Sequence, residues 1–365
     1  MKPFTLRDYQ LEAATWLSKR RRGVIVLAAG GGKTVTVALA LDMVIRARAR
    51  SRPVRIGWMC STTEQRDQGK SALDAFPNMA QQDIKIACAA ANTDWSDRDV
   101  LVIDECHHIS QDNQWRQQAD TCKGAIYGMT ATPVTGNDER DKAFRDFWRD
   151  IHTISRASVI HTLSSASVTW LDASDIMAGQ IVEQETDKMV RWRGKFFKGD
   201  EGQLWGQCAW LCAVEWGIVK NQERNKAAIK AALSHSEPTL VLVNQVEHAQ
   251  WMADQLPNSV ACFAKMGKKK RKAAMDDFKA GKVQRLVATS LADEGLDLPV
   301  AAVLVLVSAG RSEIKTVQRT GRVLRIHEGK QGAIIYDFKD TFHGLMRKHA
   351  QKRRDIYAEL GYKQA

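Results

Sequence analysis

Two short segments in the first third of the chain carry residue types that could handle a phosphate group. Residues 27–34 read LAAGGGKT and lie between an apolar run at 23–28 and an amphipathic stretch that suits a helix. In a strand–loop–helix context, backbone N–H groups can surround a phosphate. Lys33 would then reach the terminal phosphates, and Thr34 would be a ligand of Mg²⁺. The segment predicts a phosphate-binding loop.

The loop departs in one place from the common pattern of such segments. Leu27 stands where the first glycine is usual, so the backbone freedom must come from the later glycines, Gly30, Gly31 and Gly32. The alternative interpretation is a glycine-rich turn followed by a solvated lysine. The position between a strand pattern and a helix pattern favours the phosphate loop.

The second segment, residues 100–108, reads VLVIDECHH. Four apolar residues predict a buried strand, and the carboxylates that follow would lie at the carboxyl edge of a sheet, where ligands bind in folds of this kind. Asp104 would hold Mg²⁺ through water, and Glu105 would polarise the attacking water molecule. A carboxylate pair after a strand can also be a solvated loop, but some 70 residues after a phosphate loop it favours catalysis.

Alternating strand and helix patterns must position both segments. Before residue 136, apolar runs alternate with amphipathic stretches such as 34–48, which indicates a parallel, doubly wound sheet. The predicted strands are 23–28, 55–60, 84–89, 100–103 and 125–129.

The same alternation returns in the last third of the chain. Its predicted strands are 239–243, 260–263, 285–289, 302–307 and 333–337, with a closing helix at 347–362. Between the two regions the strand pattern disappears, and the sequence becomes rich in Trp and charge. We therefore expect an α/β protein with one domain at 1–136, a mainly helical linker or insert at 137–222, and a second domain at 223–365.

The composition narrows the class of protein. A formal charge of +12 and a pI near 9.4 favour a polyanionic partner, because Lys and Arg that neutralise phosphates release counterions. Seven scattered cysteines are typical of reduced thiols in the cytoplasm, and they form no cluster with zinc-ligand spacing. No apolar run is long enough to span a bilayer, so we expect no membrane association.

Further motifs, in order along nearly the whole chain, resemble those of superfamily 2 helicases of the DExH type. The motifs are LRDYQ (6–10), LAAGGGKT (27–34), DECH (104–107), TAT (130–132), the segments 242–252 and 287–299, and QRTGRVLR (318–325). The resemblance implies two RecA-like domains with ATP bound between them. It is nearest to compact ResIII-, UvsW- and XPB-like DNA helicases of phage or bacterial type.

The resemblance also implies roles for single residues. Arg7 and Gln10 would recognise the adenine base, and the fifth motif would add Gly295 and Asp297 to the nucleotide site. His107, Thr130 and Thr132 would couple hydrolysis to strand movement. Arg322 and Arg325 would be arginine fingers that stabilise charge on the transferring phosphoryl group, with Gln318 as the counterpart of His107. A basic helix face is the alternative for these arginines.

A nucleic-acid track is implied by hydroxyl and amide residues in both domains. The residues are Thr62, Thr63, Gln68, Thr289 and Ser290, although hydroxyl groups at strand ends are also common caps and turns. In RWRGKFFKG (191–199), the side chains of Arg191, Trp192 and Phe196 could stack on bases, or the aromatic rings could pack in a core.

We therefore expect an enzyme that uses ATP and Mg²⁺ to drive a DNA helicase or translocase. It would remodel duplex, forked or branched DNA and RNA–DNA hybrids, as a monomer in the cytoplasm of a bacterium or phage-infected cell. A DExH RNA helicase is one alternative, and a 2′-OH test would separate the two. The other is a nucleic-acid-stimulated ATPase that switches a partner without unwinding.

Overall fold

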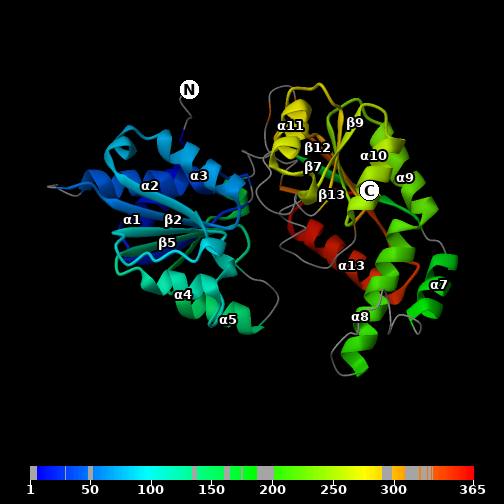
Figure 1. Ribbon diagram of the computed structural model, residues 1–365, viewed down its shortest axis with the longest axis horizontal. Coiled ribbons are helices and arrows are strands. Elements are labelled where there is room, and N and C mark those ends of the chain that lie inside the picture. The colour runs from blue at the N-terminus through cyan, green and yellow to red at the C-terminus, as the bar shows by residue number, and fades with distance from the viewer. Residues whose placement is uncertain are drawn as a thin grey trace. The chain divides into compact units, whose positions relative to one another are not determined.

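The computed structural model describes residues 6–28, 30–47, 52–133, 138–159, 165–173, 176–186, 201–289, 298–308, 320–321, 327, 330 and 332–365. These residues form two compact units. The first contains the described residues up to 159, and the second contains those from 165 onward. Each unit is built around its own parallel sheet (Figure 1).

The sheet of the first unit has the strand order β3-β2-β4-β5-β1-β6, and every neighbouring pair is parallel. The central strand β4 is fully buried, β5 is buried after its first residue, and both consist almost entirely of apolar residues, as expected for a sheet covered on both faces. The strands are β1 (Arg22–Val26), β2 (Arg55–Cys60), β3 (Asp83–Cys88), β4 (Val100–Asp104), β5 (Ala125–Thr130) and β6 (Ile151–Thr153).

Helices cover both faces of this sheet. Figure 1 shows α2 and α3 on one side and α4 and α5 on the other. Phe144, Phe147 and Trp148 at the end of α5 pack into a buried cluster with residues of β4 and β5. The helices are α1 (Asp8–Ser18), α2 (Lys33–Ala47), α3 (Thr63–Asp74), α4 (Gln114–Thr121), α5 (Asp138–Phe147) and the single turn α6 (Arg156–Val159).

The sheet of the second unit has the strand order β13-β7-β12-β11-β8-β10-β9, again with parallel neighbours. The strands are β7 (Ala166–Leu171), β8 (Thr239–Leu242), β9 (Ser259–Cys262), β10 (Arg285–Ala288), β11 (Val303–Leu306), β12 (Ala333–Phe338) and β13 (Lys363–Gln364).

The helices of the second unit share one core with its strands. Buried residues of α8, α9 and α10 pack against β8, β10 and β11. The helices are α7 (Ile176–Thr186), α8 (Glu201–Val214), which continues as a π-helical turn (Glu215–Val219), α9 (Gln222–Leu233), α10 (Val246–Gln255), α11 (Lys268–Lys279) and α13 (Gly344–Glu359). No helix among the described residues is long and apolar enough to cross a membrane.

Two parallel α/β sheets confirm the predicted fold class of two RecA-like domains. The range 137–222, predicted as a linker or insert, is divided between the units, because β6 joins the first sheet and β7 joins the second. Both strands escaped the sequence analysis. Strand β6 has only three residues, and β7 (ASVTWL) mixes hydroxyl and apolar side chains. The proposed contribution of this range to nucleic-acid contact stays a prediction.

Candidate active site

The predicted phosphate loop leaves β1 and enters α2 at Lys33. Gly30 and Gly32 have φ angles of 83° and 84°, in the left-handed region that favours glycine. The backbone N–H of Gly31 donates to the carbonyl of Ala28 at 3.0 Å, which tightens the turn. The described part of the loop therefore has the strand–turn–helix form in which helix N–H groups can face an anion.

Leu27, the departure from the usual loop pattern, is a packing residue. Its side chain is fully buried, and a Cβ atom added to Gly31 would lie 2.8 Å from Leu27 Cγ. Leucine therefore fills the space beneath the loop, and glycine is required at position 31 because the backbone passes close to that side chain.

Helix α1 supports the loop from another direction. The Tyr9 hydroxyl donates to the carbonyl of Gly31 at 2.9 Å, and Gln10 Nε2 donates to the same oxygen at 3.3 Å. Arg7 Nη1 in turn donates to the Tyr9 hydroxyl at 2.9 Å. The predicted roles of Arg7 and Gln10 in adenine recognition stay predictions. Sequence reasoning missed Tyr9, whose only signal was its place inside LRDYQ.

The two predicted carboxylates lie where β4 ends. Asp104 is its last residue and is 7% exposed, and its Oδ1 accepts a hydrogen bond of 2.9 Å from the backbone N–H of Glu105. Glu105 has a φ of 49°, an uncommon left-handed conformation for a residue with a side chain. The chain turns sharply here into a short 3₁₀ turn, Cys106–His108, and backbone strain of this kind is often found at functional sites.

Electrostatics connects the carboxylates to the loop. Burial and the adjacent Glu105 carboxylate raise the pKa of Asp104, and the positive charge of Lys33 opposes this rise. Burial also acts to raise the pKa of Glu105, but Lys33 and the neighbouring His107 and His108 outweigh it and lower that pKa. Lys33 therefore lies close enough to both carboxylates to influence their ionisation, as a lysine that shares a phosphate with them would.

A hydrogen bond joins the second segment to the TAT segment. His107 Nδ1 lies 2.9 Å from the Thr130 hydroxyl, and both residues are buried. The same hydroxyl bonds to the backbone of Thr132, accepting from its N–H at 3.1 Å and donating to its carbonyl at 3.3 Å. The three residues predicted to couple hydrolysis to movement thus form one continuous network, although the coupling itself stays a prediction.

The residues present fit a Mg²⁺ ion bound together with ATP. Asp104 and the Thr34 hydroxyl supply the oxygen ligands that Mg²⁺ prefers. Glu105 Oε2 lies 3.3 Å from His107 Nδ1, yet it is buried and has no hydrogen-bond partner among the described residues. A cation or a bound water would satisfy this buried carboxylate pair. Within the described ranges, no group of three or more His, Cys, Asp and Glu side chains could hold a metal ion unaided, and Mg²⁺ bound through phosphates needs no such group.

The described residues that are predicted to contact nucleic acid lie at the start of α3 or within it, and directly after β10. Thr62 is the N-cap of α3, and its hydroxyl accepts from the N–H of Gln65 at 3.2 Å, so the capping alternative holds for this residue. Thr63 begins α3, and Gln68 lies one turn further along the helix. Thr289 directly follows β10 and is 6% exposed. Their contact with nucleic acid stays a prediction.

Several predicted site residues fall outside the described residues. They are Arg191, Trp192, Phe196, Ser290, Gly295, Asp297, Gln318, Arg322 and Arg325. Their assignments therefore rest on the motifs alone.

Comparison with protein families matches two parts of the chain. Residues 79–135 match the model described as the type III restriction enzyme res subunit, which includes the DECH and TAT segments. Residues 223–327 match the helicase conserved C-terminal domain.

Curated relatives extend the similarity over nearly the whole chain. Putative helicase 22 of Sulfolobus islandicus filamentous virus is 22% identical and covers 98% of this chain and 68% of the viral protein. The putative DNA 3'-5' helicase Rad25 of Haloarcula marismortui is 22% identical over 88% of this chain and 50% of its own length. The DNA 3'-5' helicase XPB of Mycobacterium tuberculosis is 23% identical over 98% and 64%, respectively. The chain spans between half and about two thirds of these relatives.

Solved structures show the same architecture. The helicase domain of Hef from Pyrococcus furiosus aligns with a TM-score of 0.56 at 15% identity and covers 96% of this chain and 98% of that domain. The type ISP restriction-modification enzyme LlaBIII bound to DNA aligns with a TM-score of 0.58 at 14% identity, over 92% of this chain and 28% of that enzyme. With both family matches and both parallel sheets in place, the chain is similar to superfamily 2 helicases, which are ATP hydrolases, and it has distant XPB- and Rad25-like relatives.

Proposed function

We propose that this chain is an ATP-driven DNA helicase or translocase that remodels duplex or branched DNA, including RNA–DNA hybrids. One observation carries the proposal. Lys33 lies close enough to Asp104 and Glu105 to influence their ionisation, and the same segment connects through His107 to Thr130. This continuity supports the proposal that the first unit hydrolyses ATP and couples hydrolysis to movement.

The residues of the site divide the work of phosphoryl transfer. Backbone N–H groups at the start of α2 and the Lys33 ammonium would bind and orient the phosphates. Mg²⁺, held by Asp104 and Thr34, would neutralise charge on the phosphate oxygens. Glu105 would orient the attacking water and accept its proton. The charge of Lys33, together with the neighbouring His107, lowers the pKa of Glu105, which keeps that carboxylate ionised for this role.

Two further roles complete the proposed mechanism. Arg322 and Arg325 would stabilise negative charge that develops on the transferring group, as arginine fingers do. The hydrogen bonds from His107 through Thr130 to Thr132 would link a change at the nucleotide to a movement of the segment after β5.

DNA is the favoured substrate because the relatives from Haloarcula and Mycobacterium are described as DNA 3'-5' helicases. The positive net charge of +12 suits a polyanion but does not select DNA over RNA. An RNA helicase is the second candidate. It is supported by 24% identity to the pre-mRNA-splicing ATP-dependent RNA helicase PRP28 of Pyricularia oryzae over 75% of this chain and 40% of that protein.

The test is steady-state ATP hydrolysis with single-stranded DNA, duplex DNA, forked DNA, R-loops or structured RNA, and strand displacement on the same substrates. Stimulation and displacement on forked DNA or R-loops support the proposal. Stimulation by RNA alone would replace it with the RNA helicase, and stimulation without displacement would replace it with an ATPase switch.

A matched pair of variants ties the result to the proposed site. Lys33→Ala should abolish stimulated hydrolysis, whereas Lys352→Ala, on the exposed side of α13, should leave it unchanged. Hydrolysis that survives Lys33→Ala within a few fold would contradict the assignment of the phosphate loop.

A further inference from the structure

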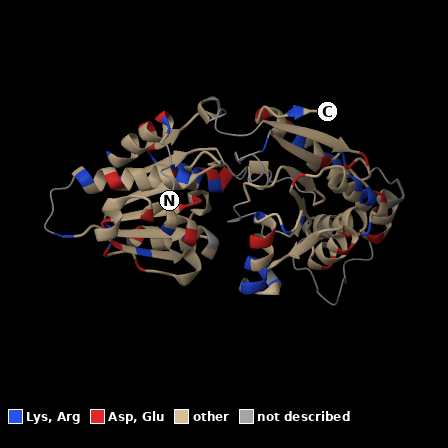
Figure 2. Ribbon diagram, turned by 90° about the horizontal axis from the view of Figure 1, so that it is seen from above, with Lys and Arg blue, Asp and Glu red and all other residues tan. Residues whose placement is uncertain are grey.

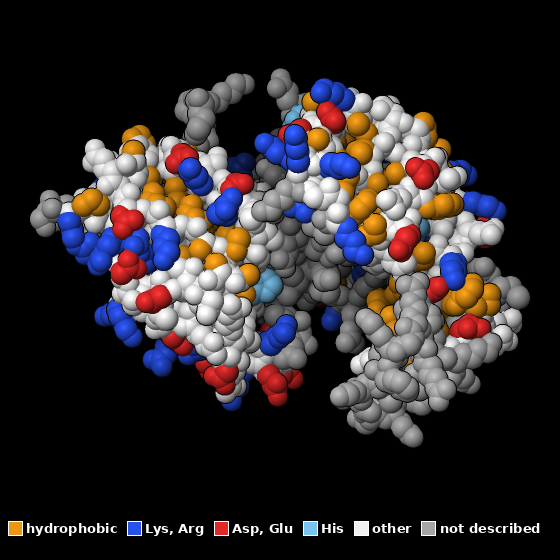
Figure 3. Space-filling model, in the orientation of Figure 1, with side chains coloured by type: hydrophobic (Ala, Val, Ile, Leu, Met, Phe, Trp, Pro, Cys, Tyr) orange, Lys and Arg blue, Asp and Glu red, His pale blue; other side chains and the backbone are white. Residues whose placement is uncertain are grey.

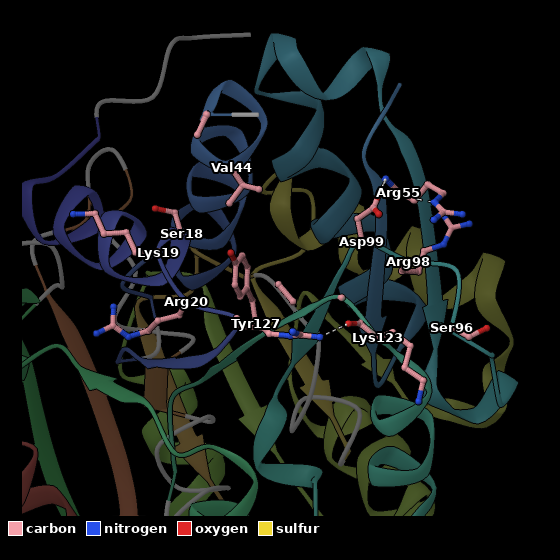
Figure 4. Close-up of a pocket in the computed structure, with 14 residues that line it drawn as sticks. Ser18, Lys19, Arg20, Val44, Arg55, Ser96, Arg98, Asp99, Lys123 and Tyr127 are labelled. Carbon is pink, nitrogen blue, oxygen red and sulfur yellow. Dashed lines mark hydrogen bonds and ion pairs between the residues drawn. The ribbon is translucent and has the colours of Figure 1, made fainter. Parts of the chain in front are cut away.

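A pocket of about 650 Å³ lies at the amino-terminal edge of the first sheet, at the end of the strands opposite Asp104 (Figure 4). Arg21 precedes β1, Arg55 begins β2, Asp99 precedes β4 and Ala125 begins β5. Its volume falls in the range of roughly 300 to 1,000 Å³ that is typical of small-molecule sites. The pocket is therefore large enough for a ligand and is separate from the candidate ATP site.

The lining of this pocket is strongly basic. Figure 4 shows Lys19 and Arg20 on one side of Tyr127, and Arg55 and Arg98 on the other. The charged residues that line it are Lys19, Arg20, Arg21, Arg55, Arg98 and Lys123, against the single carboxylate of Asp99. Lys and Arg side chains also gather on the surface beside the C-terminal end of α2 (Figure 3).

The acidic lining residue is already neutralised from outside the pocket. Arg52 donates two hydrogen bonds to Asp99, at 2.7 and 2.8 Å. The backbone N–H of Arg55 donates to the same carboxylate at 2.9 Å, but its guanidinium Nε lies 3.8 Å away. This buried Nε has no hydrogen-bond partner among the described residues. A buried guanidinium N–H without an acceptor is costly, and an anion in the pocket could satisfy it.

Three further basic side chains could bind an anion in the pocket. Lys19, Arg21 and Lys123 are exposed, and none forms an ion pair with a carboxylate in the described part of the chain. Arg21 Nη2 donates to the carbonyl of Lys123 at 3.0 Å, which joins the start of β1 to the start of β5.

Helix ends do not cancel this charge. The carboxyl ends of α1, α2 and α4 lie at the same edge, and each contributes roughly half a negative charge. Asp83 and Asp97 pair with Arg98, and Asp150 lies 3.9 Å from Arg20. The six basic lining residues and Arg52 give seven positive charges. The carboxylates of Asp83, Asp97, Asp99 and Asp150 and the three helix ends oppose them, which leaves an excess of about one to two positive charges.

We propose that this pocket binds phosphate groups, at a site distinct from the candidate ATP site, and that its ligand is a phosphate chain carried by a nucleic-acid backbone or a free polyphosphate. Guanidinium and ammonium groups from several elements converge on it, and such groups form the strong charge-assisted hydrogen bonds that bind phosphate oxygens. The polar, charged lining does not suit an apolar ligand. This binding does not depend on ATP hydrolysis or on the identity of the motor's substrate.

The test is calorimetric titration of the full chain with inorganic tripolyphosphate in low salt. The wild type should show two sites, of which Lys33→Ala removes the one at the phosphate loop. Adding Lys19→Gln, Arg21→Gln and Lys123→Gln to Lys33→Ala should weaken the remaining site by at least roughly tenfold, because three charge-assisted contacts are lost. The matched control adds Arg347→Gln, Lys348→Gln and Lys352→Gln on exposed positions of α13 to Lys33→Ala, and it should retain that site.

A competition arm distinguishes the sources of the phosphate. In the Lys33→Ala background, displacement of tripolyphosphate by an oligothymidylate identifies a nucleic-acid backbone, and failure of displacement identifies free polyphosphate. The proposal is overturned if Lys33→Ala leaves no site, or if the pocket substitutions leave its affinity within twofold. If circular dichroism shows that the variant with all three pocket substitutions is unfolded, the variant with only Lys19→Gln and Lys123→Gln is tested by the same criterion. The binding of tripolyphosphate to the pocket does not require ATPase activity. Failure of the proposed function would therefore not affect this test, and failure of this test would not affect the proposed function.

Discussion

Tyr9 and Gln10 illustrate how single residues shape the phosphate loop from outside it. Both side chains donate to the carbonyl of Gly31, which fixes that oxygen against α1. A Cβ atom on Gly32 would lie 2.4 Å from Gln10 Nε2. The loop and α1 therefore constrain each other at contact distance.

Gly32→Ala should weaken ATP binding by roughly tenfold or more, because a φ of 84° is unfavourable for alanine and its Cβ would displace Gln10. The measurement is the affinity for a fluorescent ATP analogue. Gly344→Ala, where an added Cβ meets no atom within 4 Å, is the control and should bind normally. Equal affinity for both variants would show that the loop does not bind the nucleotide.

Thr130→Val should separate hydrolysis from movement. It removes the hydroxyl that bonds to His107 but leaves Lys33 and Asp104 in place. We expect stimulated ATPase activity to fall by less than about threefold and strand displacement to fall by at least about tenfold, a loss equivalent to about 1.4 kcal/mol. Thr130→Ser, which keeps the hydroxyl, should restore displacement. A parallel loss of both activities would refute the coupling role.

The sequence was informative where chemistry requires a particular residue at a particular spacing. Lys33, Asp104 and Glu105 follow predicted strands, so both their types and their positions could be predicted. Tyr9 could not, because its hydrogen bond to Gly31 spans 22 residues of sequence and no local pattern encodes such a contact.

At the scale of elements, a buried charged cluster joins α9, α13 and the end of β12 in the second unit. Arg353 donates to both carboxylate oxygens of Asp337, at 2.8 and 3.0 Å, and to Asp340 at 3.0 Å. Arg224 pairs with the other oxygen of Asp340, and Tyr357 donates to Asp337 at 2.8 Å. The cluster is almost completely buried and fixes α13 against the sheet.

Arg353→Met should destabilise the second unit by about 3 to 5 kcal/mol, because Asp337 and Asp340 would stay buried without their shared partner. Urea denaturation monitored by circular dichroism measures the free energy of unfolding. Lys352→Met, at the neighbouring exposed position, should change it by less than about 0.5 kcal/mol. A loss below 1 kcal/mol for Arg353→Met would mean that the cluster contributes little to stability.

His248 of α10 makes the stability of the second unit sensitive to pH. Burial and the charge of Arg224 lower its pKa from 6.5 to about 4, and its Nε2 lies 2.9 Å from Asn225 Oδ1. Between these values the unfolded chain binds a proton that the folded chain does not, so stability falls as the pH falls. From pH 6.5 to 4.5 the loss attributable to this residue is about 2 kcal/mol.

His248→Gln should remove that part of the pH dependence, because glutamine does not titrate. The measurement compares urea denaturation of wild type and variant at pH 6.5 and 4.5. Equal losses of stability in the two proteins would mean that His248 binds a proton as readily in the folded chain as in the unfolded chain.

Some elements were beyond prediction from sequence because their stability comes from the sheet. Strand β13 has two residues, and β7 pairs with β12, which lies more than 150 residues later. Both strands are held by backbone hydrogen bonds to strands that are distant in the sequence, so no local pattern predicts them. The long apolar strands and the amphipathic helix α2 were predictable because burial imposes a local pattern on them.

At the scale of the whole molecule, the positive charge should govern binding to nucleic acid. Lys and Arg residues occur in both units (Figure 2), and the chain carries a formal charge of +12. Affinity for single-stranded DNA should fall steeply between 50 and 200 mM salt, by roughly 300-fold if about six phosphates are contacted. Fluorescence anisotropy at several salt concentrations gives the slope. An affinity independent of salt would exclude a track that binds phosphates.

Strand displacement on a labelled fork tests the central claim most directly. The wild type, with ATP and Mg²⁺, should separate a forked DNA duplex, and Lys33→Ala should bind the same fork but release no strand. Displacement by Lys33→Ala, or its absence in a wild type whose ATPase the fork stimulates, would contradict the account of an ATP-driven DNA motor.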